Sequence, residues 1–157
     1  TFFEILSDAI DTDFSNVQIE SCRFESIGND AIDGSGSKVA IVNCSFLNIE
    51  DKAISAGEES YFETSNNKIE NSELGLVCKD GSTLISNKDF LLNNNIDLVV
   101  FMKKKFFKQP VVHLKETEIR SNLIEKKVIV TGLNIPKNVA KRVKDKLYGN
   151  EFGKSSK

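Results

Sequence analysis

A repeat of 22 residues runs through the first hundred residues and constrains the fold more than any other feature of the sequence. Its clearest marker is a small residue followed by a hydrophobic one, at Ala9-Ile10, Ala31-Ile32, Ala53-Ile54 and Gly75-Leu76. A unit of this length is too short to enclose a core, so successive units must stack in register. Each strand then pairs with the coils on either side, at about 4.8 Å. The repeat therefore predicts an all-β parallel solenoid with 22 residues per coil.

Two further series predict the interior of this solenoid. Four hydrophobic residues recur at intervals of 22, 23 and 21, and we expect their side chains to stack inside: Phe24, Phe46, Ile69 and Phe90. A small polar residue lies three positions before each of them, at Ser21, Asn43, Asn66 and Asn87. Side-chain amides stacked in register can hydrogen-bond along the stack. We therefore expect this polar column to point inward and to satisfy buried backbone groups at a bend.

The pattern loosens after residue 100 and ends differently. Phe90 and Ile119 are separated by one repeat plus about seven residues, which predicts an insertion loop near residues 103–110. With this loop, the β-helix coils are predicted over residues 1–133.

The end of the chain carries helix signals instead of coil signals. Pro136 lies near a helix start and Gly149 is a plausible stop. Hydrophobic residues between them share one side, at Val139, Ala140, Val143 and Leu147. A solenoid end exposes core and strand edges, so an amphipathic cap is expected there. We predict a capping helix over residues 134–149 and a flexible tail over residues 150–157.

The net charge of −2 conceals a strong asymmetry between the two parts of the chain. Residues 1–100 contain 18 Asp and Glu against 6 Lys and Arg, whereas residues 101–157 contain 5 against 15. Such a division can mark an interaction surface. The simpler interpretation is that the basic end is solvated and complements the acidic part.

Two segments carry a resemblance to a known family, residues 30–37 (DAIDGSGS) and residues 52–58 (KAISAGE). Together with the rest of residues 9–100, they resemble bacterial right-handed parallel β-helix repeat proteins, in the superfamily of pectate lyases, polygalacturonases and mannuronan epimerases. The resemblance implies a right-handed solenoid and the carboxy-terminal domain of a larger surface or secreted protein. It also implies an extracellular, cell-surface or periplasmic location. It does not identify an activity, because one fold hosts many functions.

Acidic residues recur in register near the start of the chain. Asp8 and Asp30 share one column, Asp11 and Asp33 share another, and Asp13 lies nearby. Stacked carboxylates would approach within about 5 Å, which is unfavourable unless something offsets the repulsion. Exposure to water, a shared proton or a bound cation could do so. The acids are therefore solvated turn residues, a calcium site of Asp11, Asp13 and Asp33, or a catalytic cluster of Asp8, Asp11, Asp30 and Asp33.

Two classes of function remain open. The favoured one is a non-catalytic module of an exported bacterial protein that binds polysaccharide or acts as a scaffold in a surface assembly. The alternative is a polysaccharide lyase, hydrolase or uronate epimerase in which clustered Asp residues act as acid and base. Polygalacturonase-like relatives use clustered Asp, but their Arg-Ile-Lys and Gly-His-Gly elements, and the Asp-Pro-His-Glu motif of the epimerases, are missing here.

Each class needs different neighbours. An enzyme would need a cation beside the acids, for which Arg23 and Lys52 are the candidates. A binding module would need exposed aromatic residues beside a groove, for which Tyr61 and Phe62 are the candidates. The expected partners are a polysaccharide, upstream domains of the same protein or other proteins of a surface assembly; no nucleic acid is expected. Calcium is the one cofactor considered.

Some functions are excluded by composition. His113 is the single histidine, so this chain cannot assemble a histidine-based metal site or a Ser-His-Asp triad. The three cysteines, at positions 22, 44 and 78, show neither a disulfide framework nor zinc-ligand spacing. The longest apolar stretch, near residues 96–102, is far too short to span a membrane.

Overall fold

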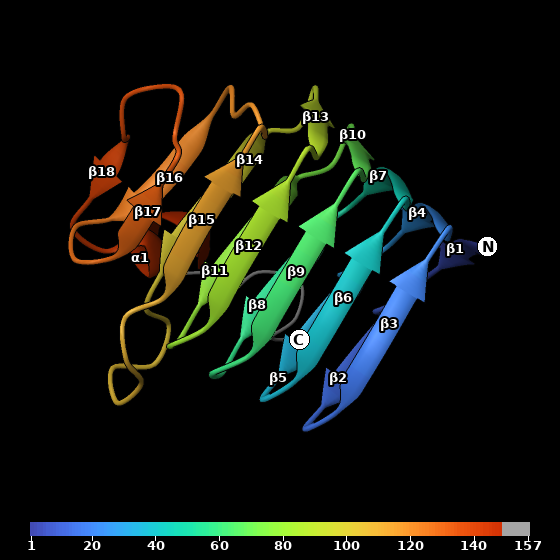
Figure 1. Cartoon of the computed structure of the whole chain (residues 1–157), viewed down its shortest axis with the longest axis horizontal. Helices are drawn as coiled ribbons and strands as arrows, with labels where there is room; N and C mark the ends of the chain where they lie inside the picture. Colours follow the sequence, from blue (N-terminus) through green and yellow to red (C-terminus); the bar gives the residue numbers. More distant parts are fainter. Residues whose placement is uncertain (149–157) are drawn as a thin grey trace.

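The computed structural model describes residues 1–148, which form 18 short strands and one short helix. The strands belong to three sheets in which every pairing is parallel, and up to β15 the chain passes through the three sheets in turn (Figure 1). The predicted all-β solenoid with about 22 residues per coil is confirmed. We call the sheets A, B and C in the order in which the chain first enters them.

Each sheet collects one strand from each successive coil. Sheet A contains β1 (Phe2–Ile5), β4 (Arg23–Ile27), β7 (Ser45–Ile49), β10 (Lys68–Glu70) and β13 (Phe90–Leu92). Sheet B contains β2 (Ile10–Asp13), β5 (Ile32–Ser35), β8 (Lys52–Gly57), β11 (Leu74–Lys79), β14 (Ile96–Phe101), β16 (Asn122–Glu125) and β18 (Val139–Ala140). Sheet C contains β3 (Asn16–Glu20), β6 (Lys38–Val42), β9 (Tyr61–Ser65), β12 (Thr83–Asn87), β15 (Val111–Lys115) and β17 (Ile129–Thr131).

A stack of aromatic rings fills the interior beside sheet A. The ring centroids of Phe2 and Phe24 are 4.7 Å apart and those of Phe24 and Phe46 are 4.8 Å apart, with interplanar angles of 2°. Ile69 continues the column and is fully buried. The predicted stacking of Phe24, Phe46 and Ile69 is confirmed.

Phe90 was wrongly placed in this column. It pairs with Lys68 and is 46% exposed, whereas Leu91 pairs with Ile69 and is 1% exposed. The side chains of a strand alternate between its two faces, so a shift of one residue moves Phe90 from the interior to the surface. Leu91 therefore takes the place of Phe90 in the core column.

The inward polar column also lies further along the chain than we predicted, by one residue at Cys22, Cys44 and Asn67 and by two at Asp89. Asn43 and Asn66 are exposed and have φ angles of 54°, in the left-handed region that asparagine tolerates. The inward positions follow them, at Cys22, Cys44, Asn67, Asp89 and Thr117.

From Cys44 onwards, each of these inward side chains accepts a hydrogen bond from a backbone N–H of the preceding coil. Asn67 Oδ1 accepts from the Cys44 N–H and Asp89 Oδ1 accepts from the Asn67 N–H, both at 2.9 Å. Thr117 Oγ1 accepts from the Asp89 N–H at 3.1 Å. The predicted function of the column is therefore correct, although its residues were not.

The predicted insertion loop separates β14 from β15 and extends beyond the solenoid at the lower left of Figure 1. Thr83 pairs with Tyr61, 22 residues before it, and with Val111, 28 residues after it, so the loop adds six residues to one coil. The Lys104 N–H donates to the Asp80 carboxylate at 2.7 Å and ties the loop to the preceding coil.

The C-terminal helix is shorter than predicted. The predicted region, residues 134–149, contains β18, which pairs with β16, and then helix α1 (Val143–Tyr148). Strand pairing therefore takes Val139 and Ala140 out of the helix. Residue 149 and the predicted tail, residues 150–157, lie outside the described residues.

Helix α1 packs against outward-facing side chains of sheet B. A second hydrophobic cluster, separate from the solenoid core, consists of Leu74, Val77, Val99, Phe101, Leu123, Ala140 and Val143. The helix thus covers the outer face of the last coils, where sheet B carries hydrophobic residues.

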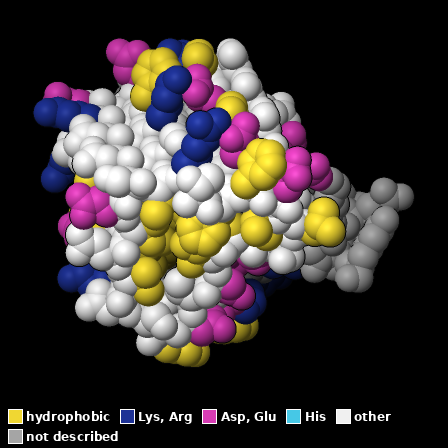
Figure 2. Space-filling view, turned by 90° about the vertical axis from the view of Figure 1, so that its right-hand side faces the viewer, with side chains coloured by type: hydrophobic (Ala, Val, Ile, Leu, Met, Phe, Trp, Pro, Cys, Tyr) yellow, Lys and Arg dark blue, Asp and Glu magenta, His cyan; other side chains and the backbone are white. Residues whose placement is uncertain are grey.

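The first coil is open at the opposite end. Strands β1, β2 and β3 each form an edge of their sheet. Phe2, Ile5, Ile10 and Val17 are only partly buried against the core, and Figure 2 shows hydrophobic side chains gathered on this end of the molecule. This end presents both strand edges and core side chains.

Candidate functional site

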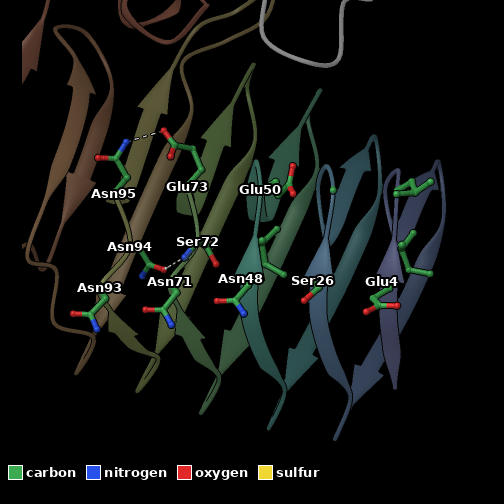
Figure 3. A pocket seen from close by; sticks show the side chains of 14 residues that line it. Glu4, Ser26, Asn48, Glu50, Asn71, Ser72, Glu73, Asn93, Asn94 and Asn95 are labelled. Carbon is green, nitrogen blue, oxygen red and sulfur yellow. Dashed lines mark hydrogen bonds between the residues drawn. The ribbon is translucent and has the colours of Figure 1, made fainter.

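A long open groove follows the turn that connects sheet A to sheet B, which we call the A–B corner. Its volume is about 1140 Å³. Figure 3 shows that its lining side chains come from successive coils and form rows along the solenoid. The groove therefore extends in the stacking direction of the coils.

The first row contains one outward residue from each of five coils: Glu4, Ser26, Asn48, Asn71 and Asn93. Their φ angles lie between 52° and 57°, so every coil bends here through a left-handed residue. Asparagine is among the few residues other than glycine that adopt this conformation readily. The bend explains why asparagine recurs, and it leaves the amides of Asn48, Asn71 and Asn93 exposed.

The second row lies two residues further along each coil, at Leu6, Gly28, Glu50, Glu73 and Asn95. Backbone hydrogen bonds hold it in register: the Glu50 N–H donates to the Ile27 carbonyl and the Glu73 N–H to the Ile49 carbonyl, both at 2.9 Å. Gly28 comes so close to the first coil that an added Cβ would lie 2.8 Å from the Leu6 carbonyl oxygen.

Residues between the two rows form the floor, which changes from hydrophobic to polar along the groove. Ile5 and Ile49 lie in the earlier coils, and Ser72 and Asn94 in the later ones. Asn94 Oδ1 accepts from the Ser72 N–H at 3.0 Å, and Asn95 Nδ2 donates to Glu73 Oε1 at 2.7 Å (Figure 3). Side-chain bonds thus link neighbouring coils at the polar end.

The polar side chains that line the groove are either neutral amides and hydroxyls or negatively charged carboxylates. Exposed amides provide both donors and acceptors, and the carboxylates of Glu4, Glu50 and Glu73 provide acceptors. No lysine, arginine or aromatic residue among residues 1–148 lines it. These groups suit a ligand rich in hydroxyls.

The predicted acidic residues lie elsewhere, on or beside the outer face of sheet B. Asp8 acts as a backbone acceptor: its Oδ1 accepts from the Asp30 N–H at 2.9 Å and from Asn29 Nδ2 at 2.6 Å. Asp30 repeats this contact with the next coil and accepts from the Lys52 N–H at 3.2 Å. Both acids therefore connect coils.

Lys52, which was predicted as a cation beside the acidic residues, forms an ion pair with Asp30. Its Nζ lies 3.0 Å from Asp30 Oδ1 and 2.6 Å from Asp51 Oδ2, and the side chains of Lys52 and Asp30 are 5% and 4% exposed. Burial alone would lower the pKa of Lys52, but the charges of Asp30 and Asp51 raise it by more than burial lowers it. The pKa of Lys52 is therefore above its usual value. Burial raises the pKa of Asp30 to about 7, and Lys52 offsets the rise only in part because the negative charges of Asp51 and Asp33 add to it.

Asp11 and Asp33 are directly opposed in register, as predicted. Burial, with the negative charges of Asp33, Asp13 and Asp8, raises the pKa of Asp11. Within residues 1–148, no group of three or more His, Cys, Asp or Glu side chains is arranged to hold a metal ion.

A lysine that the sequence analysis missed approaches these acids instead. Lys79 Nζ lies 3.5 Å from Asp33 Oδ1, although the two residues are two coils apart. Its side chain crosses Gly57, where an added Cβ would lie 2.6 Å from Lys79 Cε. Gly57 lies 22 residues before Lys79 in the sequence, and this aligned glycine was the one sequence feature that could have indicated the contact.

The other predicted contact residues do not converge. Arg23 pairs with Glu25 at 2.6 Å on sheet A. Tyr61, on the outer face of sheet C, donates to Glu63 at 3.2 Å. Phe62 is fully buried and packs against Gly34, so its predicted place in a surface site was wrong. Neighbouring residues of a strand point to opposite faces, which separates Tyr61 from Phe62.

The groove residues themselves were missed, although their spacing is regular. Asn48, Asn71 and Asn93 are 23 and 22 residues apart and follow the hydrophobic column by two positions. Asparagine is common in turns because it tolerates left-handed backbone angles. A regular spacing of asparagines therefore predicts turns, but it does not predict a groove at those turns.

Comparisons with known proteins identify the fold. A family model described as a right-handed β-helix region matches residues 3–133. No curated protein and no solved structure matches the chain. Separately, no helix within residues 1–148 is long and apolar enough to cross a membrane.

Proposed function

The chain belongs to the right-handed β-helix family, and we propose that within this fold it is a non-catalytic module that binds a polysaccharide in the groove of the A–B corner. The observation that carries the proposal is the pair of aligned rows along one groove, which are polar except at Leu6 and Gly28. A polysaccharide is itself a linear repeat, so it can meet the same group in successive coils, as at Asn48, Asn71 and Asn93. We propose that it lies along the stacking direction.

The groove is suited to many weak contacts rather than one strong contact. Each amide can donate to one hydroxyl and accept from another. Linked contacts of this kind add up, because every contact after the first is intramolecular. Backbone bonds between coils hold the rows in place before binding, which reduces the ordering cost.

The proposal includes a location outside the cell or in the periplasm, where structural polysaccharides are found. A scaffold function in a surface assembly would use the open first coil, since β1, β2 and β3 have one unpaired edge each among the described strands. Polysaccharide binding and assembly would then use different surfaces.

Co-sedimentation with a panel of insoluble polysaccharides, followed by titration with soluble fragments, tests the binding proposal. The informative variant is Asn48→Gly/Asn71→Gly, which removes two groove amides where φ is 56° and 52°. Glycine accepts such angles without strain. Loss of these contacts should weaken binding by about tenfold.

The chain offers a matched control in Asn43→Gly/Asn66→Gly. These asparagines are also exposed and left-handed, with φ of 54°, but they lie outside the groove. The control should bind like the wild-type protein. Equal weakening in both double variants, or no weakening in either, would refute the groove as the binding site.

A polysaccharide-modifying enzyme is the second candidate, and one observation favours it. Asp30 has a pKa raised to about 7 beside Lys52, and such perturbed pairs are common in active sites. Asp8, Asp11 and Asp33 would contribute nearby. The test is the release of new reducing ends or unsaturated ends from the same panel, with Asp30→Asn as the variant. Product formation that depends on Asp30 would favour catalysis over binding.

A further inference from the structure

We propose that the insertion loop between β14 and β15 is a docking site for the surface of a lipid bilayer that contains anionic lipids. The loop lies at the turn that connects sheet B to sheet C, which we call the B–C corner, and it extends beyond the solenoid (Figure 1). This surface is separate from the groove of the A–B corner, so the inference does not depend on polysaccharide binding. It is carried by an exposed aromatic side chain beside exposed lysines.

The tip of the loop exposes an aromatic ring to water. The Phe107 N–H donates to the Lys104 carbonyl at 3.3 Å, so Lys105 and Phe106 are the two central residues of a turn. Phe106 is 80% exposed, and its ring centroid lies 4.6 Å from that of the partly buried Phe107. Removing an aromatic ring from water is favourable. Phe106 is therefore suited to enter the boundary between lipid headgroups and acyl chains.

The first two lysines of the loop fix its position. The Lys104 N–H donates to the Asp80 carboxylate at 2.7 Å, and the Lys104 ammonium pairs with Glu58. Lys103 Nζ lies 5.6 Å from the centroid of the Tyr148 ring, which connects the loop to helix α1. A loop that is held in place before binding pays less for its ordering at a surface.

Four further lysines of the B–C corner are exposed. Lys105 and Lys108 belong to the loop, and Lys126 and Lys127 belong to the turn between β16 and β17. The two segments lie in adjacent coils, because β15 and β17, the strands that follow them, pair with each other. None of the four lysines forms an ion pair with a carboxylate of residues 1–148. Exposed lysines of this kind are attracted to a surface of anionic lipids.

The acidic residues of the B–C corner in these and the two preceding coils are mostly engaged. Glu58 pairs with Lys104, and Asp80 accepts from the Lys104 N–H. Glu125 accepts from the backbone of helix α1 at 3.3 Å. Glu59 is exposed. The exposed positions of these coils therefore carry a positive balance at this corner.

Apolar side chains among the lysines favour a lipid surface over a soluble anionic polymer. Ile129 follows Lys126 and Lys127 closely in the chain and is 48% exposed, so it adds aliphatic surface to that of Phe106. Attraction of an anionic polymer needs only the positive charges. The boundary of a bilayer takes up apolar side chains as well as attracting lysines. The composition of this corner therefore matches a bilayer that contains anionic lipids.

The experiment uses the absence of tryptophan from the chain, because Phe106→Trp then places a single fluorescent reporter at the tip of the loop. Vesicles are made of phosphatidylcholine alone, or of equal parts of phosphatidylcholine and phosphatidylglycerol. With the anionic vesicles, the emission should shift to shorter wavelength and should be quenched by lipids brominated on their acyl chains, because the ring leaves water. Partition to the neutral vesicles should be about tenfold weaker. Added salt should reduce this difference, because it screens exposed charges.

Two variants separate the charges from the apolar contact, and co-sedimentation with the anionic vesicles measures both. Lys105→Gln/Lys108→Gln should weaken partition by about tenfold, and Phe106→Ser should weaken it by about the same factor. The matched control is Lys88→Gln/Lys115→Gln, which makes the same change in net charge at exposed positions where sheet C turns towards sheet A. The control should partition like the wild-type protein, and an equal loss in the control would overturn the inference.

The B–C corner of the first coil offers a control for the reporter. Phe14 is 88% exposed there but follows Asp13 and has no lysine beside it in the sequence. Phe14→Trp should show neither a shift nor quenching with the anionic vesicles. Equal responses at positions 14 and 106 would overturn the inference.

Three further results would also overturn it. The first is an absence of partition to the anionic vesicles. The second is partition without a shift at Phe106→Trp, which would mean that the lysines attract the surface but the ring does not enter it. The third is tighter binding to soluble heparin than to the anionic vesicles, which would assign the surface to an anionic polymer. Polysaccharide binding in the groove stands or falls separately, because Phe106→Ser should leave it unchanged.

Discussion

Two corners of the solenoid use the same backbone bend for opposite purposes. At the A–B corner, a left-handed residue in each coil points into an open groove. At the C–A corner, which connects sheet C to sheet A, a left-handed residue is also exposed, but the next residue points inward and is polar. In the earlier coils the next residue differs: Ile5, Ile27 and Ile49 follow the bend at the A–B corner, whereas Cys44, Asn67 and Asp89 follow it at the C–A corner. In the later coils Ser72 and Asn94 follow the bend at the A–B corner, and Asn94 Oδ1 accepts from the Ser72 N–H as the residues of the C–A corner do.

The comparison shows where polar side chains stabilise this fold and where they are available to a ligand. The inward side chains of the C–A corner bind backbone groups of neighbouring coils, so they are committed to structure. The outward amides at the A–B corner, on Asn48, Asn71 and Asn93, face solvent. Substitutions at the two corners should therefore affect different properties.

The largest expected effect is at the C–A corner. Asp89 is buried and accepts from the hydroxyls of Thr64 and Ser86 and from the backbone and side chain of Asn67. Asp89→Ala leaves these donors without an acceptor and should lower the free energy of unfolding by about 3 kcal/mol. Urea denaturation measures the change. Asn93→Gly, at the A–B corner, should stay within about 0.5 kcal/mol of the wild-type protein, and equal losses in the two variants would remove the distinction between the corners.

A smaller loss of stability is expected at Gly28, where two coils of the A–B corner lie close together. In Gly28→Ala, the new Cβ would lie 2.8 Å from the backbone oxygen of Leu6. The close contact must be relieved by a small movement of the backbone, so the loss should be about 1–2 kcal/mol. Polysaccharide binding should weaken at the same time, because the shift moves the start of the groove. Unchanged stability and unchanged binding would show that the two coils are not in close contact there.

A pH titration examines the charged residues just beyond the A–B corner. The pKa of Asp30 is about 7 in the folded protein against 3.8 for an unperturbed carboxyl group. Between these values the folded state binds more protons than the unfolded state, so this group makes stability fall as pH rises from 4 to 7. In Asp30→Asn this contribution should be absent, and the difference in unfolding free energy between variant and wild type should change across that window. A constant difference from pH 4 to pH 8 would contradict the raised pKa.

The smallest expected effect comes from the left-handed asparagines themselves. Glycine at Asn43 and Asn66, or at Asn48 and Asn71, relieves the backbone but makes the unfolded chain more flexible. The two double variants should change stability by about 0.5 kcal/mol or less, and by the same amount at both corners. Thermal unfolding checks this. A large loss at one corner would show that its asparagines have a structural function that the other corner lacks.

The sequence predicted the solenoid because its core repeats at nearly constant spacing. Phe24 and Phe46 are one coil apart and stack in the interior. Between Phe46 and Ile69 the spacing is 23 residues, so the extra residue leaves the register of the next coil open. Because side chains alternate between the two faces of a strand, an error of one residue in the register places a side chain on the wrong face, as happened for Phe90.

The site was predictable in part. Lys52 was named as a partner for the acids, and it contacts Asp30 because equivalent positions in adjacent coils are neighbours. Lys79 reaches two coils back across Gly57, and register alone does not predict such a long reach. The asparagines of the groove repeat visibly in the sequence, but left-handed asparagines also occur at the C–A corner outside the groove, so the repeat alone does not show which corner is open.

The most direct test of the account observes both corners in one sample. Side-chain amide signals of asparagine can be followed individually by NMR while a soluble glycan that binds is added. The account predicts that the signals of Asn48, Asn71 and Asn93 shift with a common saturation curve, whereas those of Asn43 and Asn66 stay in place. Shifts confined to Asn43 and Asn66, or spread evenly over all five residues, would contradict the groove of the A–B corner as the binding site.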